Sequence, residues 1–332
     1  MKHNNIAIFI PHLGCKNSCS FCNQRTISGT QKSPTIKEVR DVLNKAALQI
    51  ENKNDTEIAF FGGSFTAIDN EYMLALLETA NEFVGDAGFS GIRISTRPDA
   101  INCDVLQTLK KYHVNAIELG AQSMSQEVLD ANDRGHTTKD VLKSSELIKQ
   151  FGFELGLQMM VGLFSATPEK DIATAEKIIE LAPDTVRIYP TVILKHTKLC
   201  ELFLDGRYKP ISLETAVSLC AKLLVMFEQN SIKVIKLGLH ASNEVQNEMV
   251  GGIYHPAFRE LCEGKIYLDN AIAELKKSKF KSATLVVDKS AVSKMIGQKR
   301  CNINALADMG YKVHVCQGND IPLYKVFVNE EV

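Results

Sequence analysis

Short apolar runs recur along the first 190 residues, separated by segments in which apolar residues recur at spacings of three and four. Runs of this length predict buried strands, and the spacing in segments such as 35–50 and 138–152 predicts amphipathic helices. Strands that alternate with helices predict right-handed βαβ units around a parallel sheet. The chain is therefore predicted to form an α/β fold, a partial (β/α)6 parallel barrel, with strands at 6–10, 57–61, 91–96, 116–120, 154–160 and 185–189.

Polar and glycine-rich segments follow the predicted strands at their carboxyl ends, where ligands gather in folds of this kind. A loop with three cysteines follows the first strand, and Gly62 and Gly63 follow the second. Because the carboxyl ends of parallel strands meet at one edge of a sheet, these segments predict a single shared site. The other segments of this kind are RPD (97–99), AQS (121–123) and YPT (189–191).

The residues after the sixth strand divide into a continuation of the barrel and a small C-terminal module. A helix at 212–229 and a strand at 232–239 continue the barrel, and the lysine-rich run KKSKFK (276–281) marks a boundary. We expect one domain over 1–275 and a second, α+β domain over 276–332. The second is predicted to contain a strand at 283–288, a helix at 290–296, a turn at 297–300, a helix at 301–309 and strands at 311–315 and 323–328.

Composition places the chain among globular proteins with a sizeable core, because 45% of its 332 residues are hydrophobic and 23% are charged. No apolar run approaches the roughly 18 to 20 residues that a membrane span needs. The apolar opening at 6–10 is too short for the core of a signal peptide. We therefore expect a cytoplasmic protein that does not associate with a membrane.

Charge is distributed unevenly, although the formal net charge is only −1. Residues 276–332 carry ten Lys and Arg against five Asp and Glu, whereas the preceding 275 residues carry a balance of −6. A basic tail on an acidic body predicts a polyanionic partner for the tail. A basic surface that contacts only solvent is the alternative that charge alone leaves open.

Three cysteines, Cys15, Cys19 and Cys22, lie within eight positions directly after the first strand. Without an export signal, such a cluster favours a metal site or a redox group over disulfides. Three thiolates can hold three irons of a cubane cluster and leave the fourth iron open. Zinc in a structural site needs four ligands, so His12 would have to be the fourth ligand beside the three cysteines. Inert thiols are the third alternative. The spacing favours the open [4Fe–4S] cluster.

The cysteine loop, with Phe21 before its last cysteine, resembles that of the radical S-adenosylmethionine (SAM) superfamily. Four downstream motifs resemble the radical SAM domain of the catalytic subunit of Elongator, which modifies wobble uridine in tRNA. This resemblance implies a barrel of radical SAM type, a [4Fe–4S] cluster whose fourth iron binds SAM, and an external electron donor of the flavodoxin or ferredoxin type. The motifs are STRPD (95–99), IELGAQSMSQEVLDANDRGHT (117–137), GLQMMVGL (156–163) and VRIYPTVILKHTKLCELFLDGRYKP (186–210).

The resemblance also implies which residues contact SAM. Gly62 and Gly63, followed by Ser64, would let the backbone approach the amino group, and Arg134 would pair with the carboxylate. An ordinary turn and a solvated arginine are the respective alternatives. The further implied contacts are Gln122 and Ser123 near the cofactor, Gln158 at the ribose, and Phe21 beside the adenine. An aromatic of the core is the alternative for Phe21, and Arg97 lies either at the cofactor or in the turn that it shapes.

The C-terminal order of helix, turn, helix and strand resembles a KH RNA-binding module, whose G-x-x-G loop clamps single-stranded RNA. The loop here runs from Gly297 through Gln298 and Lys299 to Arg300, so arginine replaces the second glycine. That departure leaves two cations and a helix N-terminus to meet phosphate. A module for packing or dimer contacts is the alternative. Further candidates for phosphate contacts lie in YPTVILKHTKL near the mouth of the barrel: Lys195 and Lys198, beside Tyr189 and His196. A loop that contacts only solvent is the alternative for this segment.

The Elongator subunit carries an acetyltransferase domain after its radical SAM domain, and fewer than a hundred residues follow residue 240 here. We therefore expect a radical SAM enzyme that generates a 5′-deoxyadenosyl radical to modify tRNA or another RNA, without acetyl transfer by such a domain. One alternative is a radical SAM enzyme that acts on a small molecule such as a porphyrinogen. The other is an RNA-binding protein with a structural or redox-sensing cluster. The oligomeric state is left open.

Overall fold

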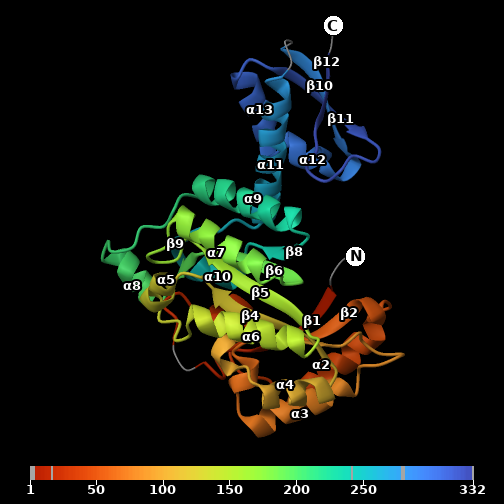
Figure 1. Cartoon of the computed structure of the whole chain (residues 1–332), viewed down its shortest axis with the longest axis vertical. Coiled ribbons are helices and arrows are strands. Elements are labelled where there is room, and N and C mark those ends of the chain that lie inside the picture. The colour runs from red at the N-terminus through yellow and green to blue at the C-terminus, as the bar shows by residue number, and fades with distance from the viewer. Residues whose placement is uncertain (1–3, 16–17, 241, 278–280, 331–332) are drawn as a thin grey trace. The chain divides into compact units, whose positions relative to one another are not determined.

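The computed structural model describes residues 4–15, 18–240, 242–277 and 281–330. Its larger sheet consists of seven parallel strands in the order β1-β2-β3-β4-β5-β6-β8 (Figure 1). The predicted α/β class and partial parallel barrel are confirmed, and the seventh strand is the continuation predicted at 232–239. The strands are β1 (Asn4–Ile10), β2 (Thr56–Gly62), β3 (Ile92–Thr96), β4 (Val114–Gln122), β5 (Glu154–Val161), β6 (Thr185–Pro190) and β8 (Lys233–Leu237).

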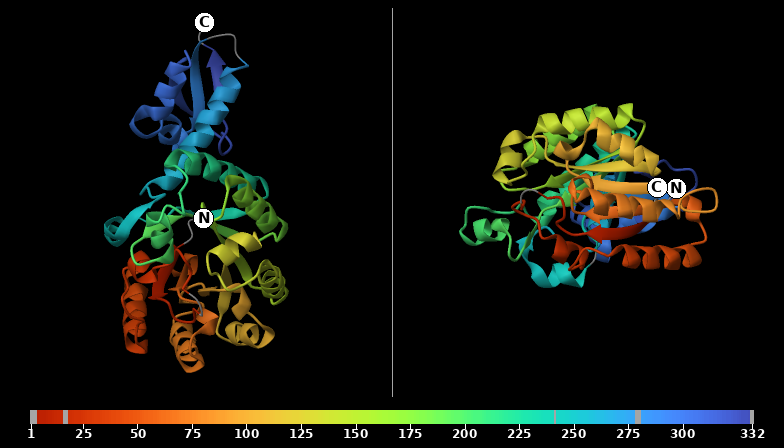
Figure 2. Two further views of the ribbon diagram at one scale, coloured as in Figure 1. Left: turned by 90° about the vertical axis from the view of Figure 1, so that its left-hand side faces the viewer. Right: turned by 90° about the horizontal axis from the view of Figure 1, so that it is seen from below.

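Helices follow the strands along the chain and form an outer layer around the curled sheet (Figure 2). Two of them start with capping boxes, Thr35 with Glu38 and Thr137 with Asp140, which satisfy N–H groups that a helix start leaves unpaired. No helix in the described ranges has the length and apolar character needed to cross a membrane. The long helices of the layer are α2 (Ile36–Gln49), α3 (Asn70–Asn81), α4 (Cys103–Lys111), α6 (Thr138–Gln150) and α7 (Pro168–Glu180).

Shorter elements complete this part of the chain. The antiparallel pair of β7 (Val192–Leu194) and β9 (Met249–Gly252) lies apart from the main sheet. The short helices are α1 (Gln24–Ser28), α5 (Gln126–Ala131), α8 (Lys198–Leu204) and α10 (Asn243–Glu248).

The two faces of the parallel sheet differ in chemistry. Aliphatic side chains such as Ile58 and Ile94 are fully buried in the core. Alternate residues of the same strands, such as Phe61 and Ser95, line a cavity instead. Because successive side chains of a strand point to opposite faces, the runs can be apolar and still present selected polar groups to the interior of the barrel.

A buried ion network connects neighbouring strands of the barrel. The Arg93 side chain is fully buried, and its Nε lies 2.6 Å from Glu57. Its two terminal nitrogens lie 2.8 Å from Glu154 and 3.4 Å from Glu118. Glu118 also pairs with Arg187 of β6 at 2.6 Å. A buried charge without its partner is costly, so each group depends on the others.

The chain forms two compact units, residues 1–211 with 227–253, and residues 212–226 with 254–332. In the second, β10 pairs in parallel with β11 and antiparallel with β12. This unit starts upstream of the boundary expected at 275 and 276, because α11 packs on α12, α13 and β12. Part of the lysine-rich run, 278–280, lies outside the described residues. The elements are most of α9 (Leu213–Gln229), and all of α11 (Phe258–Leu275), β10 (Ser282–Asp288), α12 (Val292–Ile296), α13 (Cys301–Asp308), β11 (Lys312–Gly318) and β12 (Phe327–Glu330).

Candidate functional site

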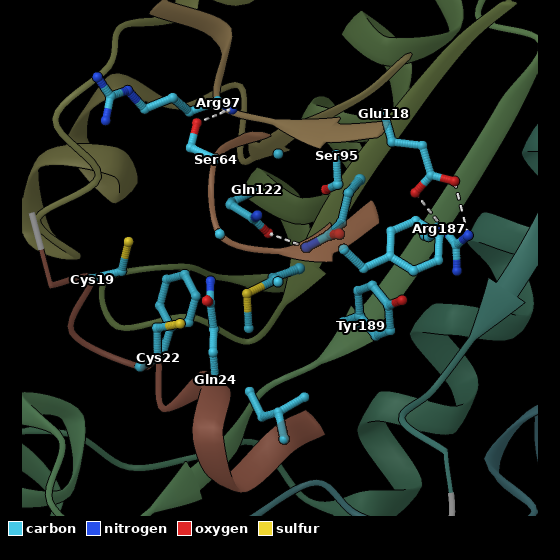
Figure 3. A pocket seen from close by; sticks show the side chains of 18 of the residues that line it. Cys19, Cys22, Gln24, Ser64, Ser95, Arg97, Glu118, Gln122, Arg187 and Tyr189 are labelled. Carbon is cyan, nitrogen blue, oxygen red and sulfur yellow. Dashed lines mark hydrogen bonds and ion pairs between the residues drawn. The ribbon is translucent and has the colours of Figure 1, made fainter. Parts of the chain in front are cut away.

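A cavity of about 400 Å³ opens at the carboxyl ends of the parallel strands (Figure 3). Its wall combines the cysteine loop, the loops after β2 and β3, the ends of β4, β5 and β6, and the segment between α5 and α6. Segments that are far apart in the sequence therefore share one site, as their positions after the strands predict. The residues predicted for the cluster and for SAM that line it are Cys15, Cys19, Phe21, Cys22, Gly62, Gly63, Ser64, Arg97, Gln122, Arg134 and Gln158.

A buried polar pair ties the cysteine loop to α5. The Ser20 hydroxyl donates to Asn132 Oδ1 at 2.7 Å, and the Ser20 N–H donates to the Asn132 carbonyl at 3.1 Å. The Ser20 carbonyl accepts the N–H of Leu199 from α8 at 2.7 Å. Because Ser20 and Asn132 are fully buried, these bonds fix the loop segment that carries Cys19 and Cys22.

The three cysteines line the same cavity, but the described residues contain no ready-made group of three His, Cys, Asp or Glu side chains around a metal position. Burial, followed by repulsion from the Cys19 and Cys15 thiolates, raises the pKa of the Cys22 thiol to about 12. A metal binds the thiolate form, so its own positive charge must offset this cost. Burial also raises the pKa of the Cys15 thiol. Thiols such as Cys15 and Cys22 that resist ionisation by themselves fit a cationic iron centre.

His12 is engaged within the loop and does not complete a zinc site. Its Nε2 accepts the backbone N–H of Gln24 at 3.1 Å, while the Gln24 side-chain oxygen accepts the backbone N–H of His12. Burial and the nearby charge of Arg25 lower the pKa of His12, which keeps the ring neutral and able to accept this bond. The zinc alternative therefore lacks its fourth ligand.

Gly63 lies where the loop after β2 passes the cysteine loop at close range. A Cβ on Gly63 would lie 2.2 Å from the Leu13 carbonyl oxygen and 2.7 Å from that of Ile10. The Gly63 N–H donates to Ile10 at 2.7 Å, and the Ser64 N–H donates to Leu13 at 2.8 Å. With these N–H groups engaged, an ammonium group, which only donates, would bind peptide carbonyls here.

Replacing Gly63 with alanine is expected to push the cysteine loop away from β2, because the added methyl group meets backbone atoms that cannot rotate aside. Overpacking of this kind costs about 1–3 kcal/mol. Thermal unfolding of the metal-free protein measures the loss of stability. The iron content after reconstitution shows whether the displaced loop still binds the cluster. Gly206→Ala is the control for iron content, because no atom lies within 4 Å of its Cβ position; its left-handed backbone, with φ of 72°, makes alanine cost some stability there without displacing the cysteine loop. Equal iron content in the two variants would contradict the expectation.

Arg134 reaches toward the cysteine loop. Its Nη1 donates to Cys19 Sγ at 2.9 Å and its Nη2 donates to the Gly120 carbonyl at 2.7 Å. Its buried Nε has no hydrogen-bond partner among the described residues. The nearby His136 donates to the Ala121 carbonyl, and burial with the charge of Arg134 lowers its pKa to about 4. A fixed guanidinium with an unused donor in the cavity wall suits a carboxylate ligand.

Gln122 turns into the cavity at an irregular point of β4. Its backbone is left-handed, with φ of 63°, and the register to β5 shifts between Leu119 and Gln122. The Gln158 amide donates to Gln122 Oε1 at 3.3 Å. This amide pair offers both donors and acceptors, as the hydroxyl groups of a ribose require.

Arg97 connects three loops and also lines the cavity. Its Nη1 donates to the Gly14 carbonyl of the cysteine loop, and its Nε lies 2.8 Å from Asp99. Its backbone N–H donates to Ser64 Oγ at 3.0 Å. Of the two roles considered for Arg97, these contacts support the shaping of the turn.

Ser123, predicted to lie near the cofactor, is not among the residues that line the cavity. Its hydroxyl pairs with Thr174 of α7 at 3.3 Å and accepts the N–H of Ser125 at 3.1 Å. Because neighbouring residues at a strand end point to opposite faces, Gln122 faces the cavity and Ser123 faces α7.

Lys195 and Lys198, predicted to contact phosphate, lie outside the cavity lining. Lys198 pairs with Asp133 at 2.6 Å, and Lys195 lies 3.8 Å from Glu248. Both side chains are exposed. Tyr189, from the same motif, does line the cavity.

Several cavity residues were not predicted from the sequence, among them Glu118 and Arg187. Each is a charged residue inside an otherwise apolar strand, IELG and VRIY. A charge in a strand that is buried on both faces must have a partner or a ligand. That signal could have placed both groups in the interior of the barrel.

Two family models match the chain. The model of the Radical SAM superfamily matches residues 9–178, and the model of the Radical_SAM C-terminal domain matches residues 183–267. The first match spans about half of the chain, including the cysteine loop. The protein therefore belongs to the radical SAM superfamily, whose members use a [4Fe–4S] cluster and SAM.

Similar proteins agree with this assignment. The chain is 24% identical to a tRNA uridine(34) acetyltransferase of Dehalococcoides mccartyi over 66% of its length, and 32% identical to Elongator complex protein 3 of Homo sapiens over 51%. It spans only 55% and 35% of those relatives. The structure of archaeal Methanocaldococcus infernus Elp3 with N-terminus deletion (1-46) has a TM-score of 0.63 at 20% identity, covering 80% of this chain and 63% of that chain. The predicted resemblance is confirmed.

The cavity fits these cofactors. Three thiols face it, an unpaired Nε of Arg134 lies in its wall, and Gly63 leaves no room for a side chain. These features match a cationic cluster and a ligand that carries both a carboxylate and an ammonium group.

Proposed function

We propose that this chain is a radical SAM enzyme that reductively cleaves SAM to modify a nucleoside of tRNA. The observation that carries the proposal is the convergence of Cys15, Cys19 and Cys22 with Arg134 on one cavity at the carboxyl ends of the strands. When bound there, a [4Fe–4S] cluster supplies the electron that splits SAM into methionine and a 5′-deoxyadenosyl radical.

The residues of the cavity bind and orient the reactants in this proposal. The three thiolates hold the cluster, the Arg134 guanidinium binds the SAM carboxylate, and peptide carbonyls at 62–63 accept from its ammonium group. Gln122 and Gln158 hold the ribose hydroxyl groups. Phe21, which is buried beside the cysteine loop, packs against the adenine and helps to exclude water.

The C-terminal loop 297–300 is the part of the chain to which we assign RNA contacts. Lys299 and Arg300 are exposed and left-handed, with φ of 51° and 62°, directly before α13. The buried Asn302 amide holds the loop through the Gly264 and Lys294 carbonyls, at 2.9 and 3.1 Å. Arg300 therefore adopts a backbone conformation in which glycine is more common. The cationic side chains of Lys299 and Arg300 lie on a loop whose position is fixed.

The double variant Lys299→Ala/Arg300→Ala is expected to weaken tRNA binding. Each phosphate contact that is lost lowers the slope of log affinity against log salt by about 0.7–0.9. Filter binding at several salt concentrations measures affinity and slope together. Lys325→Ala, another exposed lysine of this unit, is the control; an unchanged slope in the double variant would remove the loop from the RNA site.

The proposed function is tested with anaerobically purified protein, a chemical reductant and SAM. We expect release of 5′-deoxyadenosine that increases when tRNA is added. Mass spectrometry of tRNA nucleosides from cells with and without the protein identifies the modified base. Stimulation by a porphyrinogen instead of tRNA would favour the small-molecule alternative, and absence of SAM cleavage would favour a structural or redox-sensing cluster.

A further inference from the structure

The cavity has a second side that the assignments for cluster and SAM leave unused. Figure 3 shows Cys19 and Cys22 on one side of the cavity and Glu118, Arg187 and Tyr189 on the other. All of them line the same continuous space. A ligand on the second side would therefore lie beside SAM, without a wall between them.

A two-point ion pair fixes Arg187 on this second side. Its Nε lies 2.6 Å from Glu118 Oε2, and its Nη2 donates to Glu118 Oε1 at 2.8 Å. The Glu118 side chain is 4% exposed, and its carboxylate also lies 3.4 Å from Arg93. Apolar groups often replace a buried ion pair without loss of stability. The benefit of this pair is therefore the fixed orientation of the Arg187 guanidinium.

Tyr189 lines the cavity beside this guanidinium. Burial raises the pKa of Tyr189, so the phenol keeps its proton. The Arg187 guanidinium interacts with the hydroxyl and can only donate, so it engages the phenol oxygen. The O–H proton is then available to an acceptor on a ligand in the cavity.

The wall next to these polar groups is aromatic. The Arg187 guanidinium carbon lies 5.0 Å from the centroid of the Phe61 ring. The centroids of the Phe9 and Phe61 rings are 6.4 Å apart. Both rings line the cavity. Aromatic surfaces next to a fixed hydrogen-bond donor suit a flat, unsaturated ring that carries an acceptor at its edge.

We propose that this second side is the pocket for the reacting base, and that Tyr189 recognises a ring carbonyl of a uracil-type pyrimidine that lies along the aromatic wall formed by Phe9 and Phe61. This inference rests on the proposed action on a tRNA nucleoside. Tyr189 is thereby a specificity-determining residue, and the ion pair beneath it is the support that holds its donor in place. Bases without a carbonyl at that edge leave the hydroxyl unpaired, which disfavours them.

The reconstituted holoenzyme tests the pocket with anticodon stem-loop RNAs. One carries uridine at the wobble position, and two carry pyrimidinone analogues that each lack one ring carbonyl. The wild type is expected to prefer uridine over one analogue by about ten- to a hundredfold in RNA-stimulated release of 5′-deoxyadenosine, because a buried donor without a partner costs about 1–3 kcal/mol. In Tyr189→Phe, this preference is expected to fall below about threefold.

Tyr72→Phe is the matched control, because its hydroxyl contacts the Pro34 carbonyl on the outer layer; it should keep the wild-type preference. Thermal unfolding of Tyr189→Phe checks that the variant folds. If folded Tyr189→Phe keeps the full preference for uridine, the proposed base pocket is overturned, while the proposed function stands. If no RNA stimulates even the wild type, the proposed function fails and the pocket with it.

Discussion

Replacement of Cys22 with serine is expected to abolish cluster assembly and SAM cleavage. The hydroxyl group of serine is a much poorer ligand for iron than a thiolate, and Cys22 lies in the wall of the candidate cofactor cavity. Changes beyond the direct ligands already cost about 10- to 100-fold in metal affinity or activity, so loss of a ligand should exceed that range. Iron and sulfide content, visible absorbance and 5′-deoxyadenosine release measure the effect.

Cys103→Ser is the matched control for this variant. Cys103 is an exposed cysteine at the start of α4 and does not line the cavity. It should retain wild-type iron content and SAM cleavage. A Cys22→Ser protein that kept its iron and continued to cleave SAM would remove the cysteine loop from the account.

Replacement of Arg93 with methionine is expected to give the largest loss of stability. Arg93 is fully buried and lies between Glu57, Glu118 and Glu154. Methionine fills much of the space but leaves these carboxylates without their shared cation. Removal of one partner from a buried ion network costs about 3–5 kcal/mol, a large share of the roughly 5–15 kcal/mol that stabilises a native protein. Denaturant unfolding of the metal-free protein measures the difference.

The Arg93→Met loss should depend on pH in a defined direction. A buried carboxylate without its cation binds a proton more readily in the folded state than in the unfolded state, so lower pH should stabilise the variant relative to the wild type. Arg40→Met is the control, because the Arg40–Glu82 pair is solvent-exposed and such pairs contribute little. If Arg93→Met lost no more free energy of unfolding than Arg40→Met, and if that loss did not depend on pH, the result would contradict a coupled network.

Local patterns along the chain predicted the strands and the shared edge of the sheet. Runs such as IAIFI and EIAFF are long enough to identify strands by themselves, and the rule for parallel sheets places Cys22, Gly63 and Arg97 at the same end. The order of the motifs predicted the family. These features depend on neighbours in sequence or on a general property of the fold.

Features that depend on contacts between distant residues could not be predicted in this way. The pairing of Ser20 with Asn132 spans 112 positions, and nothing local to either residue indicates it. The resemblance of the motif implies a place near the cofactor for both Gln122 and Ser123, whereas the left-handed backbone at the end of β4 accompanies a contact between Ser123 and Thr174. The extent of the C-terminal unit depends on the packing of α11 against the tail, which is a tertiary property.

The most direct test of the account is electron paramagnetic resonance of the anaerobically reconstituted, reduced wild-type protein, with and without SAM. We predict iron and sulfide in the proportions of a [4Fe–4S] cluster, and a spectrum that changes on addition of SAM because one iron has an open coordination position. Zinc in place of iron, or a cluster whose spectrum SAM leaves unchanged, would contradict the central claim.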